Sequence, residues 1–349
     1  MSDRKFRIGF AGLVHDHVWW EFDKWKKLDN VDLVAAGDAN PPQLEKAQKE
    51  YGVTNLYSSW QEMLESEELD VLQVAVENSK GADVVEAAAA RGIHVTSEKP
   101  MSARLSQANR MIKASEDAGT KLLINWPSAW SPAINTMAKM IDAGEVGHLH
   151  YFKQRSAHNG PKELGCSTYF YEWLYDADLN GAGALMDYCC YSADMCSYFL
   201  GLPNSVVGIR SILAKDYPLP DDNAMILMKY DHAFGVAEAC WTQVADVITG
   251  NPVAYGSEGA LMVKGDKVIL SKPGHALKEI DAEPFPDGRS TGPEYLLTCI
   301  ETGEEVEGMC SPKVSRDAQE ILEAGLISSD TGKEVKLPLV EFGWPLAGL

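Results

Sequence analysis

The sequence predicts an α/β protein in which an N-terminal, doubly wound parallel sheet is followed by an α+β domain with a large, mostly antiparallel open sheet. Two patterns support this prediction. As far as residue 143, short apolar runs alternate with helical stretches, which is typical of a parallel sheet with helices on both faces. After Gly147, strand-like runs recur at short spacing, which is typical of an antiparallel sheet with one open face. The first half is therefore Rossmann-like.

The length also indicates two domains. The chain has 349 residues, whereas one domain holds ~150 residues on average. The change of pattern falls near residues 125–150 and contains no flexible linker, so we expect a rigid junction. We assign residues 1–125 to the Rossmann domain and residues 126–349 to the second domain.

The expected elements of the first half alternate in type. The strands cover residues 6–11, 31–36, 71–76, 93–97 and 121–125. The helices cover a segment from Trp19 to Trp25 and residues 43–51, 59–64, 82–90, 106–118 and 132–143. Apolar runs bounded by glycine, proline and charged residues are the signal for these strands.

In the second half, strands outnumber helices. The expected strands cover residues 148–158, 205–213, 224–230, 234–242, 253–255, 260–263 and 267–270. A long loop with an aromatic cluster at residues 169–175 follows the first of them. Helices are expected at residues 181–200, 293–302 and 312–328.

Composition excludes several classes of function. A formal net charge of −20 offers no basic stripe to a nucleic acid. No run approaches the ~20 apolar residues of a membrane span, and the N-terminal stretch lacks the hydrophobic segment of a signal peptide. The seven cysteines have irregular spacing without a Cys-x-x-Cys pair, which indicates reduced thiols. We therefore expect a cytoplasmic protein without nucleic-acid or membrane partners.

The strand at residues 93–97 stops on Glu98-Lys99-Pro100. Pro100 biases Lys99 toward an extended backbone, so Lys99 is held rigidly at the carboxyl end of a strand. In open α/β sheets this edge is where ligands bind. The alternative is a solvated Glu-Lys pair that closes an ordinary strand, and for an isolated tripeptide that alternative would be favoured.

The first strand and the second strand each end on a possible dinucleotide-binding residue. Gly12 is placed as the first glycine of the fingerprint, although Val14 and His17 replace the other two. Asp38 follows the second strand, where an acid binds the ribose hydroxyls and repels a 2′-phosphate. This pattern favours NAD over NADP. A glycine turn followed by an aspartate also occurs in many other α/β folds.

His15 and His17 could suggest a metal site, but no third ligand is evident in the sequence. We therefore expect no metal. A polar lining of a cofactor pocket or the start of a helix explains the two histidines better.

The helix that follows Gly181 and Gly183 has a polar face where a packed helix is usually apolar. Asp187, Tyr191 and Asp194 lie at positions i, i+4 and i+7 of that face. A buried Asp-Tyr hydrogen bond that stabilises the domain is the structural alternative.

Together, Glu98-Lys99-Pro100, the Gly-Ala-Gly-Ala-Leu-Met-Asp start of this helix and the closing segment 329–338 resemble the Gfo/Idh/MocA oxidoreductase family. The similarity extends over nearly the whole chain. It implies an N-terminal domain that holds NAD(P), and a C-terminal sheet that binds a sugar or cyclitol and makes a dimer or tetramer contact.

The resemblance also implies site residues. Lys99 and Asp187 match the family's catalytic lysine and aspartate, and Tyr191 replaces its histidine, as in members resembling glucose-fructose oxidoreductase. Cofactor contacts are expected from Gly12, Leu13, Val14, His15, Asp38, Val76, Asn78, Glu98, Lys99 and Asn125.

Oxidation of a secondary alcohol needs a base, and Lys99 near Tyr191 would lower the tyrosine's pKa from its usual ~10. Aromatic and polar side chains could bind the hydroxyls and the ring of a sugar. The candidates for these contacts are Trp126, Arg155, His158, Asn159, Tyr169 and Trp173.

The resulting hypothesis is an NAD-dependent oxidoreductase that transfers hydride between nicotinamide and a secondary hydroxyl of a sugar or sugar derivative. Two alternatives remain. One is an NAD-dependent glycosidase or lyase that oxidises the sugar transiently. The other is a non-catalytic sugar or nucleotide sensor.

Overall fold

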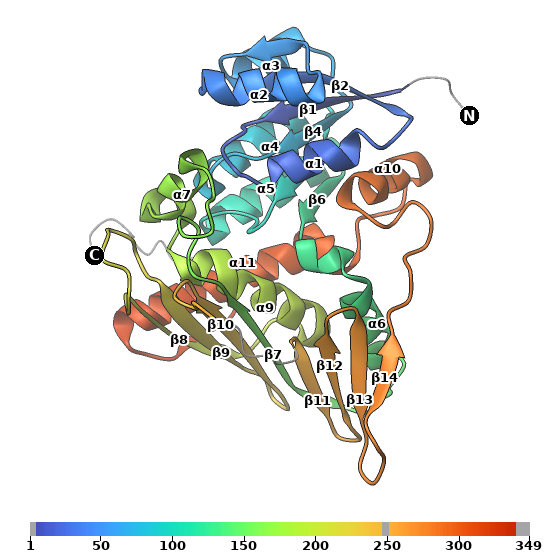
Figure 1. The fold of residues 1–349 in the computed structure, drawn as a ribbon, viewed down its shortest axis with the longest axis vertical. Helices are drawn as coiled ribbons and strands as arrows, with labels where there is room; N and C mark the ends of the chain where they lie inside the picture. Colours follow the sequence, from blue (N-terminus) through green and yellow to red (C-terminus); the bar gives the residue numbers. More distant parts are fainter. Residues whose placement is uncertain (1–4, 246–250, 340–349) are drawn as a thin grey trace.

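A computed structural model describes residues 5–245 and 251–339, and it contains two sheets stacked along the long axis (Figure 1). The six-stranded sheet has the order β3-β2-β1-β4-β5-β6, and all its strand pairs are parallel. The nine-stranded sheet has the order β14-β13-β12-β11-β7-β10-β9-β8-β15. The predicted fold class is confirmed.

The strands of the parallel sheet are short and mostly buried, as the apolar runs predict. They are β1 Phe6–Ala11, β2 Val31–Gly37, β3 Asn55–Tyr57, β4 Val71–Val74, β5 His94–Glu98 and β6 Leu122–Asn125. The sequence analysis missed β3, an edge strand of three half-buried residues. It also extended β4 by two residues, because Ala75 and Val76 continue the apolar run but belong to the turn beyond the strand.

Helices cover both faces of this sheet (Figure 1). They are α1 Val18–Trp25, α2 Pro41–Tyr51, α3 Trp60–Ser66, α4 Gly81–Ala89 and α5 Leu105–Ala118. The next helix, α6 Pro132–Asp142, packs instead on β12 and β13 of the second sheet. Local capping explains two of their starts. The hydroxyls of Ser59 and Ser131 accept hydrogen bonds from backbone N–H groups in the first turns of α3 and α6.

The second sheet is antiparallel except for the pair β7 and β10. Its strands are β7 Leu149–Ala157, β8 Ser205–Ser211, β9 Asn223–Lys229, β10 Phe234–Cys240, β11 Val253–Gly256, β12 Ala260–Lys264, β13 Lys267–Ser271, β14 Lys278–Asp281 and β15 Val335–Lys336. The edge strands β14 and β15 were not predicted. Both are short and largely exposed, so they lack an apolar signal.

The aromatic segment predicted as a loop contains two short helices, α7 Thr168–Leu174 and α8 Ala177–Asn180. The carboxylate of Asp176 caps α8 by accepting from two backbone N–H groups. The remaining helices are α9 Ala184–Leu200, α10 Gly292–Thr302 and α11 Pro312–Thr331. Short 3₁₀ turns occur at Asn78–Lys80, Pro127–Trp130 and Gly308–Cys310.

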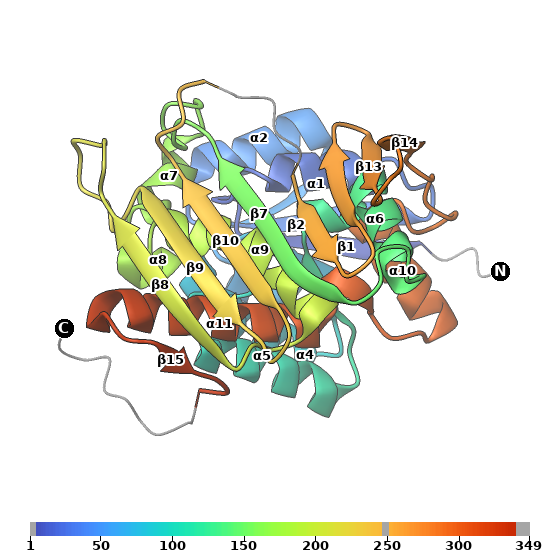
Figure 2. The ribbon, with the colours of Figure 1, turned by 90° about the horizontal axis from the view of Figure 1, so that it is seen from below.

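Helices α9 and α11 lie between the two sheets and cover the inner face of the nine-stranded one (Figure 1). From below, the strands lie in front of the helices, and no helix of the described residues covers the outer face of β7–β10 (Figure 2). The strands alternate accordingly, since β9 buries every second residue and exposes the others. The open sheet predicted from the sequence is therefore present.

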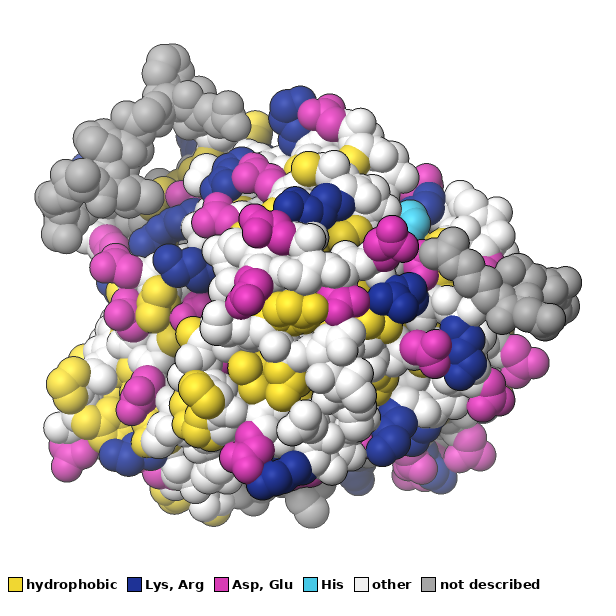
Figure 3. All heavy atoms as spheres, turned by 90° about the horizontal axis from the view of Figure 1, so that it is seen from above, with side chains coloured by type: hydrophobic (Ala, Val, Ile, Leu, Met, Phe, Trp, Pro, Cys, Tyr) yellow, Lys and Arg dark blue, Asp and Glu magenta, His cyan; other side chains and the backbone are white. Residues whose placement is uncertain are grey.

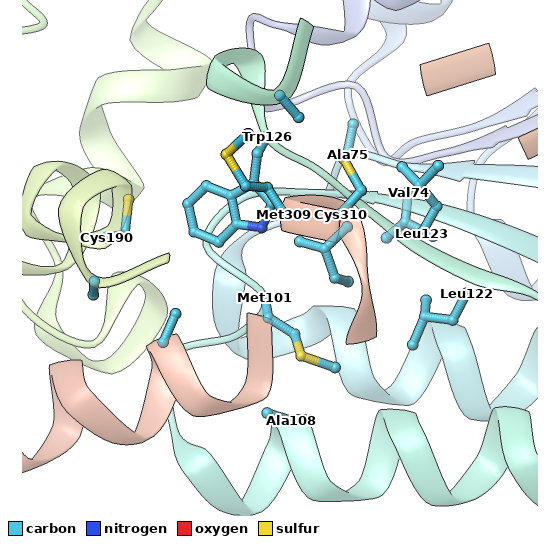
Figure 4. Close-up of a cluster of buried hydrophobic side chains, with 14 of the residues drawn as sticks. Val74, Ala75, Met101, Ala108, Leu122, Leu123, Trp126, Cys190, Met309 and Cys310 are labelled. Carbon is cyan, nitrogen blue, oxygen red and sulfur yellow. The ribbon is translucent and has the colours of Figure 1, made fainter. Parts of the chain in front are cut away.

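The core continues across the junction between the two sheets. Trp126, Met309, Cys310, Met101 and Cys190 cluster there from distant parts of the chain (Figure 4). The indole of Trp126 is fully buried, and its Nε1 donates to Ser315 Oγ of α11 at 2.9 Å. The sequence analysis expected Trp126 on a sugar-binding surface. This expectation is wrong, because Trp126 belongs to the interior.

Charge is distributed without a dominant basic area on the face seen in Figure 3, where acidic and basic side chains are interspersed. Arg110 of α5 pairs with Asp83 and Glu86 of α4. Among the residues described, no helix has both the length and the apolar character needed to cross a bilayer.

Replacement of Trp126 tests the junction core. We expect Trp126→Ala to lower the free energy of unfolding by about 3–5 kcal/mol, because a large buried side chain and its hydrogen bond are lost. Trp20→Ala is the matched control. Trp20 is 60% exposed, so its truncation should cost less than about 1 kcal/mol. Urea unfolding followed by circular dichroism measures both values. Equal losses would show that Trp126 does not belong to the core.

Candidate active site

A cleft of about 580 Å³ lies where the carboxyl ends of the parallel strands face α7 and α9. Its lining combines the turn after β1, the end of β5, the segment after β7 and the first turns of α9. The residues used below are Asp16, His17, Lys99, His158, Asp187 and Tyr191. The cleft thus lies at the carboxyl edge of the parallel sheet, as predicted from the position of Lys99.

Lys99 and Asp187 form a buried ion pair in this cleft. Lys99 Nζ donates to Asp187 Oδ1 at 2.7 Å, and the two residues are 1% and 5% exposed. Burial by itself would lower the pKa of Lys99. The negative charge of Asp187, together with Tyr191 and Cys190 and the hydrogen bond to Asp187, outweighs burial and raises this pKa well above its usual value. Lys99 is therefore a cation.

The start of α9 explains how Asp187 reaches Lys99. The carboxylate of Asp221 accepts from the N–H groups of Gly183 and Leu185 at 2.9 and 2.8 Å. A Cβ on residue 183 would lie 2.2 Å from the carbonyl oxygen of Asp221, so only glycine fits there. This cap fixes the first turn of α9, from which Asp187 projects.

Tyr191 lies beside the ion pair, with Lys99 Nζ 4.9 Å from the centre of its ring. The sequence analysis expected a lowered pKa at Tyr191. This is wrong for the described structure, since burial raises the pKa of Tyr191 and the charge of Lys99 offsets only part of that effect. The phenol therefore carries its proton and can donate it.

Asp194, the third residue of the polar helix face, does not line the cleft. It is fully buried, and burial raises the pKa of its carboxyl well above the usual value. Among the described residues, neither carboxylate oxygen has a hydrogen-bond partner. Burial thus favours the neutral form of Asp194, which belongs to the interior.

His158 adds a second donor to the cleft. The N–H of Gly160 donates to His158 Nδ1 at 2.7 Å, so the proton of the neutral ring is on Nε2. Its ring packs against Tyr188 with the centroids 4.6 Å apart. Burial lowers the pKa of His158 to about 4. The neutral imidazole can therefore donate a hydrogen bond to a bound oxygen.

The turn after β1 has the backbone that a dinucleotide site requires. Gly12 has φ = 77°, and a Cβ there would lie 2.4 Å from Val76 Cγ1, so glycine is needed for conformation and for packing. The N–H of Leu13 donates to Asp38 Oδ2 at 2.6 Å. Gln43 Nε2 donates to the carbonyl of Leu13 at 2.9 Å. Asp38, which directly follows β2, therefore also holds this turn in place.

The other predicted cofactor residues surround this turn. The carbonyl of Val14 accepts from Trp173 Nε1 at 3.4 Å, and Val76 packs on Gly12. Asn78 Nδ2 donates to Asn180 Oδ1 at 2.7 Å, so it joins the first sheet to α8. The ring of His15 is almost completely buried, and burial, with the charges of His17 and Lys99, lowers its pKa.

Glu98 and Asn125 lie side by side at the ends of β5 and β6. Asn125 Nδ2 donates to Glu98 Oε1 at 2.9 Å, and Trp130 Nε1 donates to Asn125 Oδ1 at 2.8 Å. The second carboxylate oxygen of Glu98 lies 3.1 Å from His17 Nδ1. Glu98 and Asn125, both predicted as cofactor contacts, are thus linked by hydrogen bonds to Trp130 on one side and to His17 on the other.

Several predicted substrate residues lie outside the cleft. Arg155 points to the outer face of the nine-stranded sheet, where it pairs with Glu238 at 3.5 Å. The period of two along β7 is the reason, because Phe152 and Gln154 take the inner positions. Asn159 receives a hydrogen bond from Lys215 on its backbone carbonyl. Neither Asn159 nor Tyr169 lines the cleft.

Trp173 supports the site from behind, since its ring is buried and lies 5.8 Å from that of His15. Of the predicted substrate residues, His158 lines the cleft. The sequence analysis missed Tyr188, Asp16 and Ser167. The carboxylate of Asp16 accepts from Ser167 N and Oγ at 2.7 and 2.6 Å. No local signal could have found this pair, which is 151 residues apart.

The residues present fit a nicotinamide dinucleotide. The carboxylate of Asp38 offers about four acceptor positions, and three donors from Leu13 and Asn40 occupy part of them. Asp38 can therefore hold a ribose hydroxyl. The turn at Gly12, Leu13 and Val14 would lie against the phosphates, and within it the N–H groups of Gly12 and Leu13 already donate to Gly37 O and to Asp38. Glu98, Lys99 and Asn125 would hold the nicotinamide end. The cofactor supplies the hydride acceptor.

Comparison with known families agrees with this geometry. A model described as an oxidoreductase family with an NAD-binding Rossmann fold matches residues 7–126, and a Gfo/Idh/MocA C-terminal domain model matches residues 134–262. The chain belongs to the Gfo/Idh/MocA family. Its N-terminal part is accordingly an NAD-binding Rossmann fold.

The individual relatives share limited sequence identity with this chain. The chain is similar to a D-apiose dehydrogenase of Paraburkholderia graminis, at 30% identity over 40% of this chain and 36% of the relative. It is also similar to a levoglucosan dehydrogenase of Pseudarthrobacter phenanthrenivorans, at 24% identity over 54% of this chain and 47% of the relative. The matched segments thus span half or less of these curated relatives.

A solved levoglucosan dehydrogenase in complex with NADH and levoglucosan has the same fold. It superposes with a TM-score of 0.82 at 19% identity, over 96% of this chain and 100% of that chain. The fold is therefore shared over nearly the whole chain.

The low pKa of His158 predicts a pH-dependent stability. The unfolded chain binds a proton at His158 below about pH 6.5, whereas the folded chain binds it only near pH 4. Stability is therefore lost as pH falls through this window. Between pH 7 and pH 5, we expect the free energy of unfolding of wild type to fall by roughly 1–2 kcal/mol more than that of His158→Gln. This range allows for the partial exposure of the His158 side chain to solvent. Urea titrations at both pH values measure this. Parallel losses would rule out a depressed pKa.

Proposed function

We propose that the chain is an NAD-dependent oxidoreductase that transfers hydride between nicotinamide and a secondary hydroxyl of a sugar or sugar derivative. The observation that carries the proposal is the buried Lys99–Asp187 pair next to Tyr191, in one cleft with the dinucleotide turn. The names of relatives, which act on apiose, levoglucosan, xylose and myo-inositol, support the substrate class.

The chain's own residues would position and move the hydroxyl proton. Lys99 and Tyr191 are protonated, and His158 presents Nε2–H, so three donors can hold the oxygen of the substrate. In the reduction direction, Lys99 or Tyr191 donates the proton that the new hydroxyl needs. In the oxidation direction, Lys99 or Tyr191 must first release its own proton so that it can accept the proton of the substrate hydroxyl. Asp187 stabilises the charged form of Lys99 that results when Lys99 accepts this proton.

The remaining assignments follow the same proposal. We assign residues 1–125 to NAD binding and residues 126–349 to substrate binding and oligomerisation, with NAD rather than NADP as cofactor because Asp38 directly follows β2. A reducing, cytoplasmic setting is consistent with seven free cysteines.

Release of bound nucleotide is the direct test of the cofactor. The purified protein is denatured, and the supernatant is assayed for NAD(H) and NADP(H); the protein as purified is also titrated with each. Bound NAD(H), or micromolar binding of NAD, is expected. Turnover on a panel of sugars and glycosides then separates the reactions. NADH accumulates in a dehydrogenase, whereas a redox-neutral glycosidase releases an aglycone. Binding of neither nucleotide would favour the sensor.

Lys99→Met should lower kcat/KM by about 10²–10⁴, the usual contribution of a positioned proton donor or acceptor. It also leaves Asp187 buried without its partner, which costs stability. The double variant Lys99→Met/Asp187→Leu removes both charges and should recover much of that stability without recovering activity. Near-normal turnover in Lys99→Met would refute the role of Lys99.

We further propose that the outer face of the nine-stranded sheet joins two copies of the chain. Apolar side chains on β8–β11 are 43–61% exposed there, and Val207 and Ile209 of β8 are the register partners of Leu227 and Met225 of β9. They are Val207, Ile209, Met225, Leu227, Phe234 and Tyr255.

Leu227→Glu should therefore convert an oligomer into a monomer in sedimentation velocity at micromolar concentration, because a charge cannot be buried unpaired in that contact. Leu277→Glu is the control, since Leu277 is exposed in the turn between β13 and β14. A monomeric wild-type protein would contradict the proposal.

A further inference from the structure

Two imidazoles and a carboxylate meet beside the turn after β1. The ligand atoms of His15, His17 and Glu98 all lie within 4.8 Å of one another. His17 Nδ1 is 3.1 Å from Glu98 Oε2. Two ligands that bind one zinc ion at ~2.0–2.2 Å are ~3.0–3.5 Å apart. His17 and Glu98 already have this spacing, and a small shift of the His15 ring would complete the set.

The three side chains are held in place by their surroundings. The rings of His15 and Phe170 are 4.5 Å apart, and His17 stacks on Trp20 at 4.7 Å. The N–H of His17 donates to His15 Nδ1 at 3.3 Å, so the neutral His15 ring carries its proton on Nε2. Coordination of an ion by His15 would replace this contact.

Glu98 has the matching outer contact. Its Oε1 accepts from Asn125 Nδ2 at 2.9 Å, and the amide of Asn125 is in turn held by Trp130. Such contacts orient a carboxylate ligand and leave its other oxygen for an ion. That other oxygen, Oε2, faces His17.

Charges of both signs act at this place, since the Lys99 cation helps to lower the pKa of His15 whereas the carboxylate of Glu98 attracts a cation. Glu98 is 5% exposed, and within the described ranges its ion-pair partner is His17 alone. The carboxylate of Glu21 is close enough for the charge of Glu98 to add to burial in raising the pKa of Glu21 to about 7. Lys24 neutralises Glu21 and not Glu98. A buried carboxylate needs a paired cation or a metal.

We propose that His15, His17 and Glu98 bind one divalent transition-metal ion, with positions left open toward the cleft. Two imidazoles and one carboxylate form the ligand set of zinc and non-haem iron sites, whereas Mg²⁺ and Ca²⁺ prefer oxygen ligands. His17 lines the cleft, so an ion held there could bind an oxygen of a molecule in the cleft. The sequence showed no third ligand because Glu98 lies 81 residues after His17.

Cobalt binding tests the site. Tag-free protein is treated with a chelator, desalted, kept reduced and titrated with Co²⁺, and then with Zn²⁺ in competition. We expect one ion per chain and visible d–d bands typical of nitrogen and oxygen ligands. His17→Ala and Glu98→Gln should each weaken binding by more than about 100-fold, beyond the loss typical of an outer-shell partner.

His275→Ala is the matched control, because His275 is exposed in the turn between β13 and β14, and it should bind like wild type. Circular dichroism shows whether each variant is folded, and Glu98→Gln keeps the shape of the side chain. A thiolate-to-cobalt charge-transfer band would place the ion at cysteines and overturn the proposal. The proposal would also be overturned if folded His17→Ala and Glu98→Gln both bound cobalt like wild type, or if wild type bound no cobalt. Metal content is independent of turnover, so this outcome is separate from that of the proposed function.

Discussion

The buried ion pair between Lys99 and Asp187 is the constraint on which the arrangement of this protein depends. Lys99 follows β5 of the parallel sheet, whereas Asp187 belongs to α9 on the nine-stranded sheet. Both side chains are almost completely excluded from solvent. Separation of such a pair leaves an uncompensated buried charge, which costs several kcal/mol. The two sheets must therefore dock so that these atoms meet, and the cleft is formed where they do.

Other polar contacts fix the same docking. Asp16 holds the start of α7 through Ser167, and Asn78 bonds to Asn180 of α8. On the opposite side, Trp126 bonds to Ser315 of α11. Each contact joins residues more than 100 positions apart. Because the partners are buried or half-buried, each one limits rotation of the first sheet against the second. The turn that faces a dinucleotide and the helix that carries Asp187 are thus held in one rigid frame.

The electrostatics of the cleft follow from its burial. Desolvation lowers the pKa of His158 and raises that of Tyr191, so both groups stay neutral near pH 7 and keep a proton. Lys99 keeps its charge because Asp187 outweighs desolvation. The cleft accordingly offers O–H and N–H donors to a ligand. Oxygen-rich molecules such as sugars suit such a surface, since each donor needs an acceptor once water has been displaced.

The sequence by itself determined the alternation of elements, the two classes of sheet and the positions of Lys99, Asp187, Gly12 and Asp38. These features depend on local signals, namely apolar runs, glycine turns and residues at strand ends. Only the tertiary structure decided which side chains meet. It turned Arg155 to the outer face, buried Trp126 and raised the pKa of Tyr191, because strand parity, packing and desolvation depend on neighbours far away in the chain. It also placed Glu98 beside His17, a proximity that follows from the parallel order of β1, β4 and β5.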